Sequence, residues 1–288
     1  MTHQSTAIDG RGIQSERLRD LRLHQQRFAE FEVFFFVPEP RTRGASEAFI
    51  SAREKQRVFT AAGFRCTVCR VGEGAASRGL RAIESGKAFY IVQRPLEPHD
   101  VLDGGRREAL DLDARSPERS EVSALTDTVS RIVWPFIERR RAALPSQAVR
   151  IGIVGSKGFF GREISSRLLV DGIEVYGLDL GEDASAITGT HIVISAVGKP
   201  GVVSKKLLGA HKDLLVDVGY SYNESEGRGY GDFDPSCYCA CEFYTPVPGG
   251  VGPLQVLTLV ERAVGRTGHL SYLPWSLPMI EGRLAFAG

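Results

Sequence analysis

Short apolar runs alternate with helix-like segments through most of the chain, and this alternation constrains the fold more than any other feature. Short apolar runs predict buried strands, and amphipathic segments between them predict covering helices. Such an order indicates a parallel sheet covered on both faces, the α/β class. The expected strands are residues 32–38, 65–71, 88–95, 149–155, 173–179, 191–198 and 214–219; the expected helices are 14–31, 45–63, 123–144, 161–172 and 204–211.

The composition argues against a nucleic-acid or membrane partner. Hydrophobic residues make up 42% of the 288 residues and charged residues 25%, as in ordinary globular domains. A formal net charge of +1 gives no bulk attraction to nucleic acid or to a membrane surface. No apolar run reaches the length of a membrane span, and the polar N-terminus lacks a secretion signal, so the expected location is cytoplasmic.

Five cysteines fall into two groups, Cys66/Cys69 and Cys237/Cys239/Cys241. Their spacing raises the question of a zinc site, but CxCxC is not a usual zinc spacing and no histidine adjoins either group. Both groups lie in segments that look extended, where cysteine behaves as a small apolar residue. We therefore expect no metal site, and no disulfide in a reducing compartment.

Three glycines, Gly155, Gly158 and Gly161, lie between an expected strand and an expected helix in the string "IGIVGSKGFFG". Bare backbone at such a turn lets amide N–H groups and the helix N-terminus approach a pyrophosphate. The strand–turn–helix context favours a dinucleotide site over a tight turn without a ligand. Residues 146–252 are accordingly expected to form a Rossmann-type, parallel-sheet NAD(P)-binding domain.

The next expected strand ends at Asp179, twenty-four residues after Gly155. An acidic side chain here accepts hydrogen bonds from the ribose hydroxyls of NAD and repels the 2′-phosphate of NADP, so the sequence favours NAD. Lys157 and Arg162 complicate this preference, because either could reach a phosphate. The alternative for Asp179 is that it only caps a loop.

Four strings follow the glycine loop in order: "ISAVGKPG", "VDVGYSY", "GDFD" and "TPVPGGVGPLQ". They resemble the nucleotide domain and closing segment of the bifunctional methylenetetrahydrofolate dehydrogenase/cyclohydrolase (FolD) family. The likeness is firm over residues 149–264 and weaker over 33–113. It implies a homodimeric folate enzyme with a nicotinamide cofactor. The cofactor site would include the three glycines and Asp179, and in addition Ser156, Lys157, Val197, Gly198, Pro200 and Gly219.

The resemblance also sets the domain boundaries. Residues 1–122 would form an N-terminal folate-binding α/β domain, which a returning C-terminal helix, within about 253–288, completes. Residues 123–145 would form a connecting helix that Pro135 is expected to kink. The tail 269–288 has no counterpart in the family.

In the family, the "TPVPGGVGP" segment lies beside the nicotinamide and the folate. The resemblance therefore assigns Pro248, Gly249 and Gly250 to the substrate site. Prolines fix the backbone of such a segment, and glycines let a flat ring lie close to it. The alternative is a rigid turn with no ligand.

The family also carries a Tyr and, four residues later, a Lys on one helical face, and the Lys is tied to the cyclohydrolase step. The string "SEAFISAREK" allows two registers, with either Phe49 and Arg53 or Ser51 and Lys55 at these places. The Tyr is missing from both. A guanidinium stays protonated, so only Lys55 could transfer a proton, and cyclohydrolase activity is in doubt. An exposed helix face is the alternative for both basic residues.

Two further residues match the family's folate site. Gln93 in "YIVQRPLEP" matches the glutamine that reaches the reacting end of the folate, and Arg94 follows it where the family has Leu. Asp113 in "LDLDAR" matches the carboxylate that pairs with the pterin ring, with Asp103 as its rival. The alternative for Asp113 is a solvated loop acid.

Three functions remain open at this point. One is an NAD-dependent methylenetetrahydrofolate dehydrogenase, whose hydride transfer needs no acid or base. Another is an enzyme on the same scaffold that has diverged to a related one-carbon or pterin substrate. The third is a non-catalytic folate- or nucleotide-binding partner protein that docks through its aromatic tail.

Overall fold

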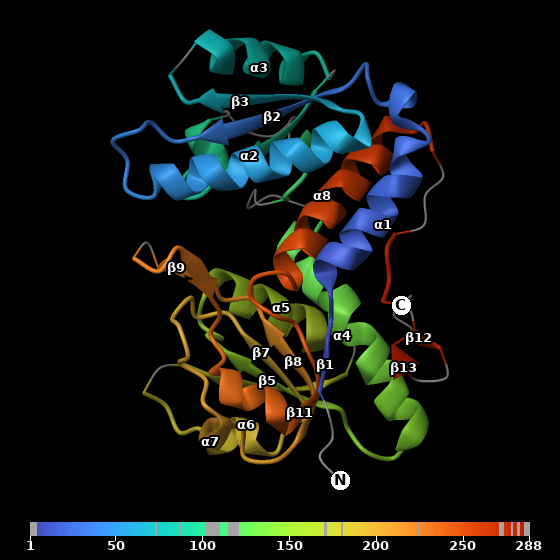
Figure 1. Cartoon of the computed structure of the whole chain (residues 1–288), viewed down its shortest axis with the longest axis vertical. Coiled ribbons are helices and arrows are strands. Elements are labelled where there is room, and N and C mark those ends of the chain that lie inside the picture. Colours follow the sequence, from blue (N-terminus) through green and yellow to red (C-terminus); the bar gives the residue numbers. More distant parts are fainter. Residues whose placement is uncertain are drawn as a thin grey trace. The chain divides into compact units, whose positions relative to one another are not determined.

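The structure is a computed structural model that describes residues 5–72, 74–86, 88–101, 110–114, 121–169, 172–179, 181–223, 225–270, 274–277, 279–280 and 283–284. The chain divides into two compact units, each an α/β arrangement, as predicted (Figure 1). The first unit combines Met1–Ile13, Leu125–Leu254 and Ser276–Gly288, and the second combines Gln14–Ala124 and Gln255–Trp275.

The first unit is built on a six-stranded parallel sheet with the order β1-β11-β8-β7-β5-β6. Its strands are β1 (Thr6–Ala7), β5 (Arg150–Val154), β6 (Glu174–Leu178), β7 (Ile192–Ser195), β8 (Lys212–Asp217) and β11 (Cys241–Tyr244). Strand β5 precedes both of its neighbours in the chain, and these pair on opposite sides of it. The strand order therefore reverses at β5, and doubly wound sheets bind ligands at the carboxyl ends beside such a reversal.

Both faces of this sheet are covered, which explains why its strands read as nearly continuous apolar runs. On one face, Val193 and Leu215 pack with Ile187 and Leu208 of two short helices. On the other face, Ile151 and Ile153 are also fully buried. The helices of this unit are α4 (Ala124–Ala143), α5 (Phe159–Leu169), α6 (Ser185–Thr188) and α7 (Lys205–Leu208); the short pair β9 (Ser221–Asn223) and β10 (Arg228–Tyr230) is antiparallel.

The second unit contains a three-stranded parallel sheet, β3-β2-β4, with β2 (Glu32–Val37) between β3 (Arg65–Arg70) and β4 (Ala88–Val92). Alternate residues of a strand face opposite sides. Phe35 therefore packs with α2 (Ala45–Ala62), while Phe34 and Phe36 pack with α3 (Gly74–Glu84). Figure 1 shows these two helices on opposite sides of the strands.

The C-terminal helix α8 (Val251–Thr267) contributes Leu259 and Val260 to the core of the second unit, so the predicted return of this helix to the N-terminal domain is confirmed. Helix α1 (Gly10–Arg22) adds Leu18 and Leu21 to the same core. It is shorter than the predicted 14–31 and continues into a 3₁₀ turn, Gln25–Arg27.

Several elements differ from the expectations. Helix α3 was not predicted, because its glycines disguise an amphipathic pattern. Helix α4 continues through Pro135 and lies, from Leu125 on, in the first unit rather than between domains. The first thirteen residues also group with that unit, because β1 pairs with β11.

Candidate functional site

The turn between β5 and α5 brings the three predicted glycines together. Gly155 has a φ of +87°, a conformation that favours glycine. A Cβ on Gly161 would lie only 2.2 Å from the carbonyl oxygen of Gly155, so α5 can begin this close to the strand only without a side chain there. The backbone N–H of Gly158 donates to the same carbonyl at 3.1 Å.

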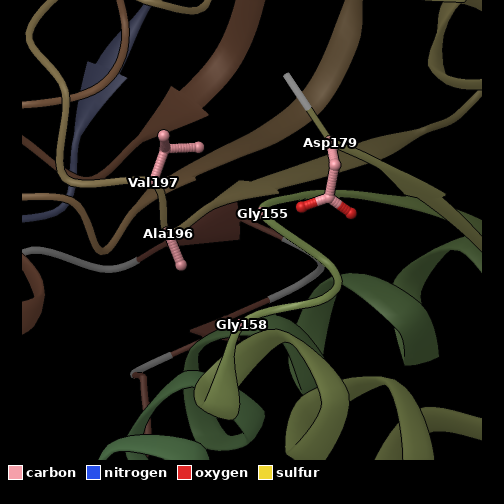
Figure 2. A pocket seen from close by; sticks show the side chains of 5 residues that line it. All are labelled: Gly155, Gly158, Asp179, Ala196 and Val197. Carbon is pink, nitrogen blue, oxygen red and sulfur yellow. The ribbon is translucent and has the colours of Figure 1, made fainter. Parts of the chain in front are cut away.

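A pocket of about 380 Å³ opens at this turn and is lined by Gly155, Gly158, Asp179, Ala196 and Val197 (Figure 2). Its walls come from the carboxyl ends of β5, β6 and β7, at the point where the strand order reverses. Helix α5 begins at Phe159, directly after Gly158 of the pocket, and the amide groups and positive dipole end of a helix N-terminus suit a pyrophosphate. The site thus has the shape and chemistry that a dinucleotide needs.

Asp179 is held against the glycine loop by the loop itself. Its carboxylate accepts hydrogen bonds from Ser156 Oγ at 2.7 Å and from the Lys157 backbone N–H at 3.1 Å. Its own backbone N–H donates to Glu182 Oε2 at 2.8 Å. These contacts fix the acid at the pocket rim, where Figure 2 shows its oxygens on the side of the loop.

The two nearby cations are engaged by protein groups. Lys157 Nζ forms an ion pair with Glu182, and this hydrogen bond raises the pKa of the lysine while it lowers that of the glutamate. Arg162 donates to the carbonyl of Lys157. Two carboxylates, those of Glu182 and Asp179, therefore act on one lysine at this edge of the pocket.

The other residues predicted at the cofactor fall into two sets. Val197 lines the pocket, and Gly198 follows it with a φ of +73°. Pro200 is exposed and does not line the pocket. Gly219 faces a buried acid instead: a Cβ on it would lie 2.1 Å from the carboxylate of Asp232.

The sequence reasoning assigned no role to Asp217 and Asp232, which are both buried. Asp232 accepts hydrogen bonds from the backbone of the loop that forms one pocket wall. Asp217 in turn accepts from the backbone N–H of Asp232 at 3.0 Å. In the sequence, the one feature that marked Asp217 and Asp232 was their place in the strings "VDVG" and "GDFD".

The segment rich in proline and glycine is a tight turn that other backbone approaches closely. The Val247–Pro248 peptide bond is cis, and Gly249 has a φ of +121°. Gly250 is buried: a Cβ on it would lie 2.7 Å from the Cβ of Thr245. Gly250 is therefore a glycine because packing within the chain leaves no room for a side chain there. Pro248, by contrast, is exposed, and Gly249 is half-buried.

In the second unit, the basic residues of the two registers of "SEAFISAREK" have different surroundings. Lys55 Nζ donates to Gln93 Oε1 and to Ser51 Oγ, both at 2.8 Å. Arg53 is exposed and donates to Gln56. The Lys55 register therefore brings a base, a hydroxyl and the predicted glutamine together, whereas Arg53 points elsewhere.

Gln93 is buried beside Lys55 and Ser51. It follows β4, is only 4% exposed, and accepts at Oε1 from both Lys55 and Ser51. Among the residues that the structure describes, its buried Nε2 finds no hydrogen-bond partner. A buried donor without a partner is costly, and a bound acceptor group would remove that cost.

Phe49 and Asp113 are not drawn into this cluster. Phe49 is 37% exposed, and the Arg70 guanidinium lies 5.2 Å from its ring centroid. Asp113 is half-buried, and its backbone N–H donates to Asp111 Oδ1 at 3.0 Å. The rival Asp103 lies outside the described residues.

The cysteines do not form a metal centre within the described residues, where no group of three His, Cys, Asp or Glu is arranged to hold an ion. Burial raises the pKa of Cys66, Cys237 and Cys241 to about 12, which disfavours thiolates. The prediction that Cys237, Cys239 and Cys241 lie in an extended segment was wrong for the first two, which belong to the 3₁₀ helix Pro235–Ala240, whereas Cys241 begins strand β11. None of the described helices combines the length and apolar character of a membrane span.

Comparison with known proteins agrees with a dinucleotide-binding role for the first unit. Residues 130–269 match the model of the tetrahydrofolate dehydrogenase/cyclohydrolase NAD(P)-binding domain. The bifunctional protein FolD of Acidithiobacillus ferrooxidans is 28% identical over 192 residues, which is 62% of this chain and 65% of that protein. The FolD protein of Mycoplasmopsis synoviae is 30% identical over 189 residues, 60% of this chain and 66% of that protein. The chain thus spans just under two thirds of the length of these curated relatives.

The likeness in fold extends further than the likeness in sequence. The crystal structure of the bifunctional FolD enzyme from Campylobacter jejuni superposes with a TM-score of 0.70 over 92% of this chain and 99% of that one, at 20% identity. At this identity the superposition establishes the two-domain fold alone. Residues 130–269 therefore belong to the NAD(P)-binding domain of the tetrahydrofolate dehydrogenase/cyclohydrolase family.

Proposed function

We propose that the protein is an NAD-preferring methylenetetrahydrofolate dehydrogenase, which oxidises 5,10-methylenetetrahydrofolate to 5,10-methenyltetrahydrofolate by hydride transfer to the nicotinamide. The observation that carries the proposal is Asp179, fixed at the rim of a pocket at the switch point of a doubly wound sheet. A carboxylate there accepts hydrogen bonds from both ribose hydroxyls of NAD and repels the extra phosphate of NADP.

The first unit would bind the dinucleotide. The amides of the glycine loop and the N-terminus of α5 would hold the pyrophosphate, and Val197 would supply an apolar wall. The ion pair between Lys157 and Glu182 supports the preference for NAD, because it occupies the cation that a 2′-phosphate would need. Hydride transfer itself asks the protein only for close stacking of two rings and exclusion of water.

The second unit would bind the folate. Gln93 is suited to donate from its buried Nε2 to an acceptor of the folate, since its Oε1 is already occupied by Lys55. Asp113 would pair with the donor edge of the pterin ring. Lys55 remains the one candidate for a residual cyclohydrolase step, in which a base takes a proton from the attacking water.

An absorbance assay tests this function directly. The purified protein is mixed with 5,10-methylenetetrahydrofolate and either NAD or NADP, and reduced cofactor and methenyl product are followed separately. We expect reduction of NAD in preference to NADP. Methenyl product that accumulates would mean that the cyclohydrolase is lost, and product that does not accumulate would mean that Lys55 works. No reduction with either cofactor would refute the dehydrogenase.

A diverged substrate is the second candidate, and one observation favours it. Ser51 stands where the family has a Tyr, so the Lys55–Gln93 pair meets a small hydroxyl in place of an aromatic ring. A substrate site without that ring would suit a related one-carbon or pterin compound. NAD binding without oxidation of methylenetetrahydrofolate would support this alternative.

A non-catalytic partner protein has less support, because the tail that would dock is partly packed away: Trp275 and Leu277 are each 3% exposed. Trp275 also donates from its backbone N–H to Glu261 and from Nε1 to Thr258. A homodimer in the cytoplasm remains part of the proposal. Light scattering of the purified protein and fractionation of cells would test these two points.

A further inference from the structure

Two buried carboxylates lie behind the wall of the dinucleotide pocket. Asp232 is 0% exposed and Asp217 is 2% exposed. A buried carboxylate is costly unless hydrogen bonds compensate for the water it loses. The hydrogen-bond donors around Asp232 and Asp217 therefore show which parts of the chain these two carboxylates hold in place.

Asp232 holds one loop from both ends. Its Oδ2 accepts from Ser195 Oγ at 2.8 Å and from the Val197 backbone N–H at 2.6 Å. Its Oδ1 accepts from the Lys199 backbone N–H at 2.8 Å. Between Ser195 and Lys199 lie Ala196 and Val197, the two residues that this loop contributes to the pocket.

Asp217 holds Asp232 in turn. Its carboxylate accepts from the backbone N–H groups of Asp232, at 3.0 Å, and Phe233, at 3.1 Å. Two glycines make room for the pair: a Cβ on Gly219 or on Gly231 would lie 2.1 Å from the Asp232 or the Asp217 carboxylate, respectively. The arrangement thus combines two carboxylates, the backbone and hydroxyl donors that satisfy them, and two bare backbone positions, next to the pocket wall.

We propose that Asp232 is a positioning residue of the dinucleotide site: by gripping Val197 and Lys199 it fixes the Ala196–Val197 wall in the form that binds the cofactor. The inference rests on the proposed function only in that the pocket takes a dinucleotide, and it is independent of the folate. Its chemistry is specific to a carboxylate. An Asn has one accepting oxygen, and its NH₂ group would face one of the two backbone donors.

Asp232→Asn is the test, and Asp234→Asn is the matched control. Asp234 lies two residues away, and its carboxylate accepts from the backbone N–H and hydroxyl of Ser236 instead of from the pocket loop. Calorimetric titration with NAD should show the dissociation constant of Asp232→Asn raised about tenfold, the effect of one lost charge-assisted hydrogen bond. The control should bind as the wild type does. Amide exchange at Val197 and Lys199 should quicken in Asp232→Asn alone.

A folded Asp232→Asn that binds NAD with wild-type affinity would overturn the inference, and so would an equal loss in Asp234→Asn. If Asp232→Asn does not fold, Ser195→Ala replaces it, because that change removes one donor and keeps both backbone contacts. Its dissociation constant should rise about threefold, because the Asp232 carboxylate loses one of the contacts that orient it toward Val197 and Lys199. An unchanged dissociation constant would also overturn the inference. If the wild-type protein binds NAD but does not oxidise the folate, the proposed function is refuted and this inference is unaffected. Absence of NAD binding would sink both.

Discussion

Replacement of Asp179 by Asn should turn an NAD site into one that tolerates NADP. The substitution keeps the shape of the side chain, and its remaining oxygen can still accept from Ser156 Oγ or the Lys157 N–H, so the glycine loop should keep its form. What disappears is the negative charge at the pocket rim. NADP differs from NAD by a phosphate on the ribose hydroxyl that this charge would face.

The size of the effect follows from the position of Asp179. Two unit charges about 4 Å apart interact by about 1 kcal/mol in water and about 4 kcal/mol near a protein surface. Asp179 is half-buried, so removal of its repulsion should improve NADP binding by about 2 kcal/mol, or about thirtyfold. NAD binding should weaken by about 1 kcal/mol, or about fivefold, because its ribose would meet a neutral acceptor.

Calorimetric titration with NAD and with NADP, at low ionic strength, measures both changes. Glu174→Gln is the matched control: it removes an acid from the opposite end of β6, where Glu174 accepts from Tyr176 Oη at 2.9 Å. The control should leave the ratio of the two affinities as it is in the wild type. If that ratio in Asp179→Asn also stays within about twofold of wild type, the proposed role of this charge is wrong.

Three further predictions concern other contacts. Glu182→Gln should free Lys157 and improve NADP binding several-fold, and salt titration should erase the gain, because exposed charges are screened. Where the wild-type protein hydrolyses the methenyl product, Lys55→Gln should make that product accumulate in the absorbance assay, whereas Arg53→Gln should leave the time course unchanged. Burial raises the pKa of Asp217 from 3.8 to about 7, so the folded protein keeps a proton that the unfolded chain releases in this interval. The free energy of unfolding should therefore fall as the pH rises through it; urea titrations should show this slope reduced in Asp217→Asn, and equal slopes would contradict the assignment.

The sequence by itself determined the elements whose cause is local. Alternation of apolar runs and helices indicated two parallel sheets, and the structure has them. Helix α2 ends at Gly63, as its helical pattern predicted, and this glycine has a left-handed conformation. The glycine turn and Asp179 were predicted because a strand, a turn and the end of the next strand stand in fixed order along the chain.

The tertiary structure decided whatever depends on partners far apart in sequence. The choice between Arg53 and Lys55 rests on Gln93, which lies 38 residues after Lys55 and meets it only when α2 packs on the sheet. The roles of Asp217 and Asp232 follow from their burial, which an isolated "VDVG" or "GDFD" does not reveal. The N-terminal strand joins β11 across the length of the chain. Helical and strand patterns are properties of short segments, whereas hydrogen-bond partners and burial arise only when those segments pack.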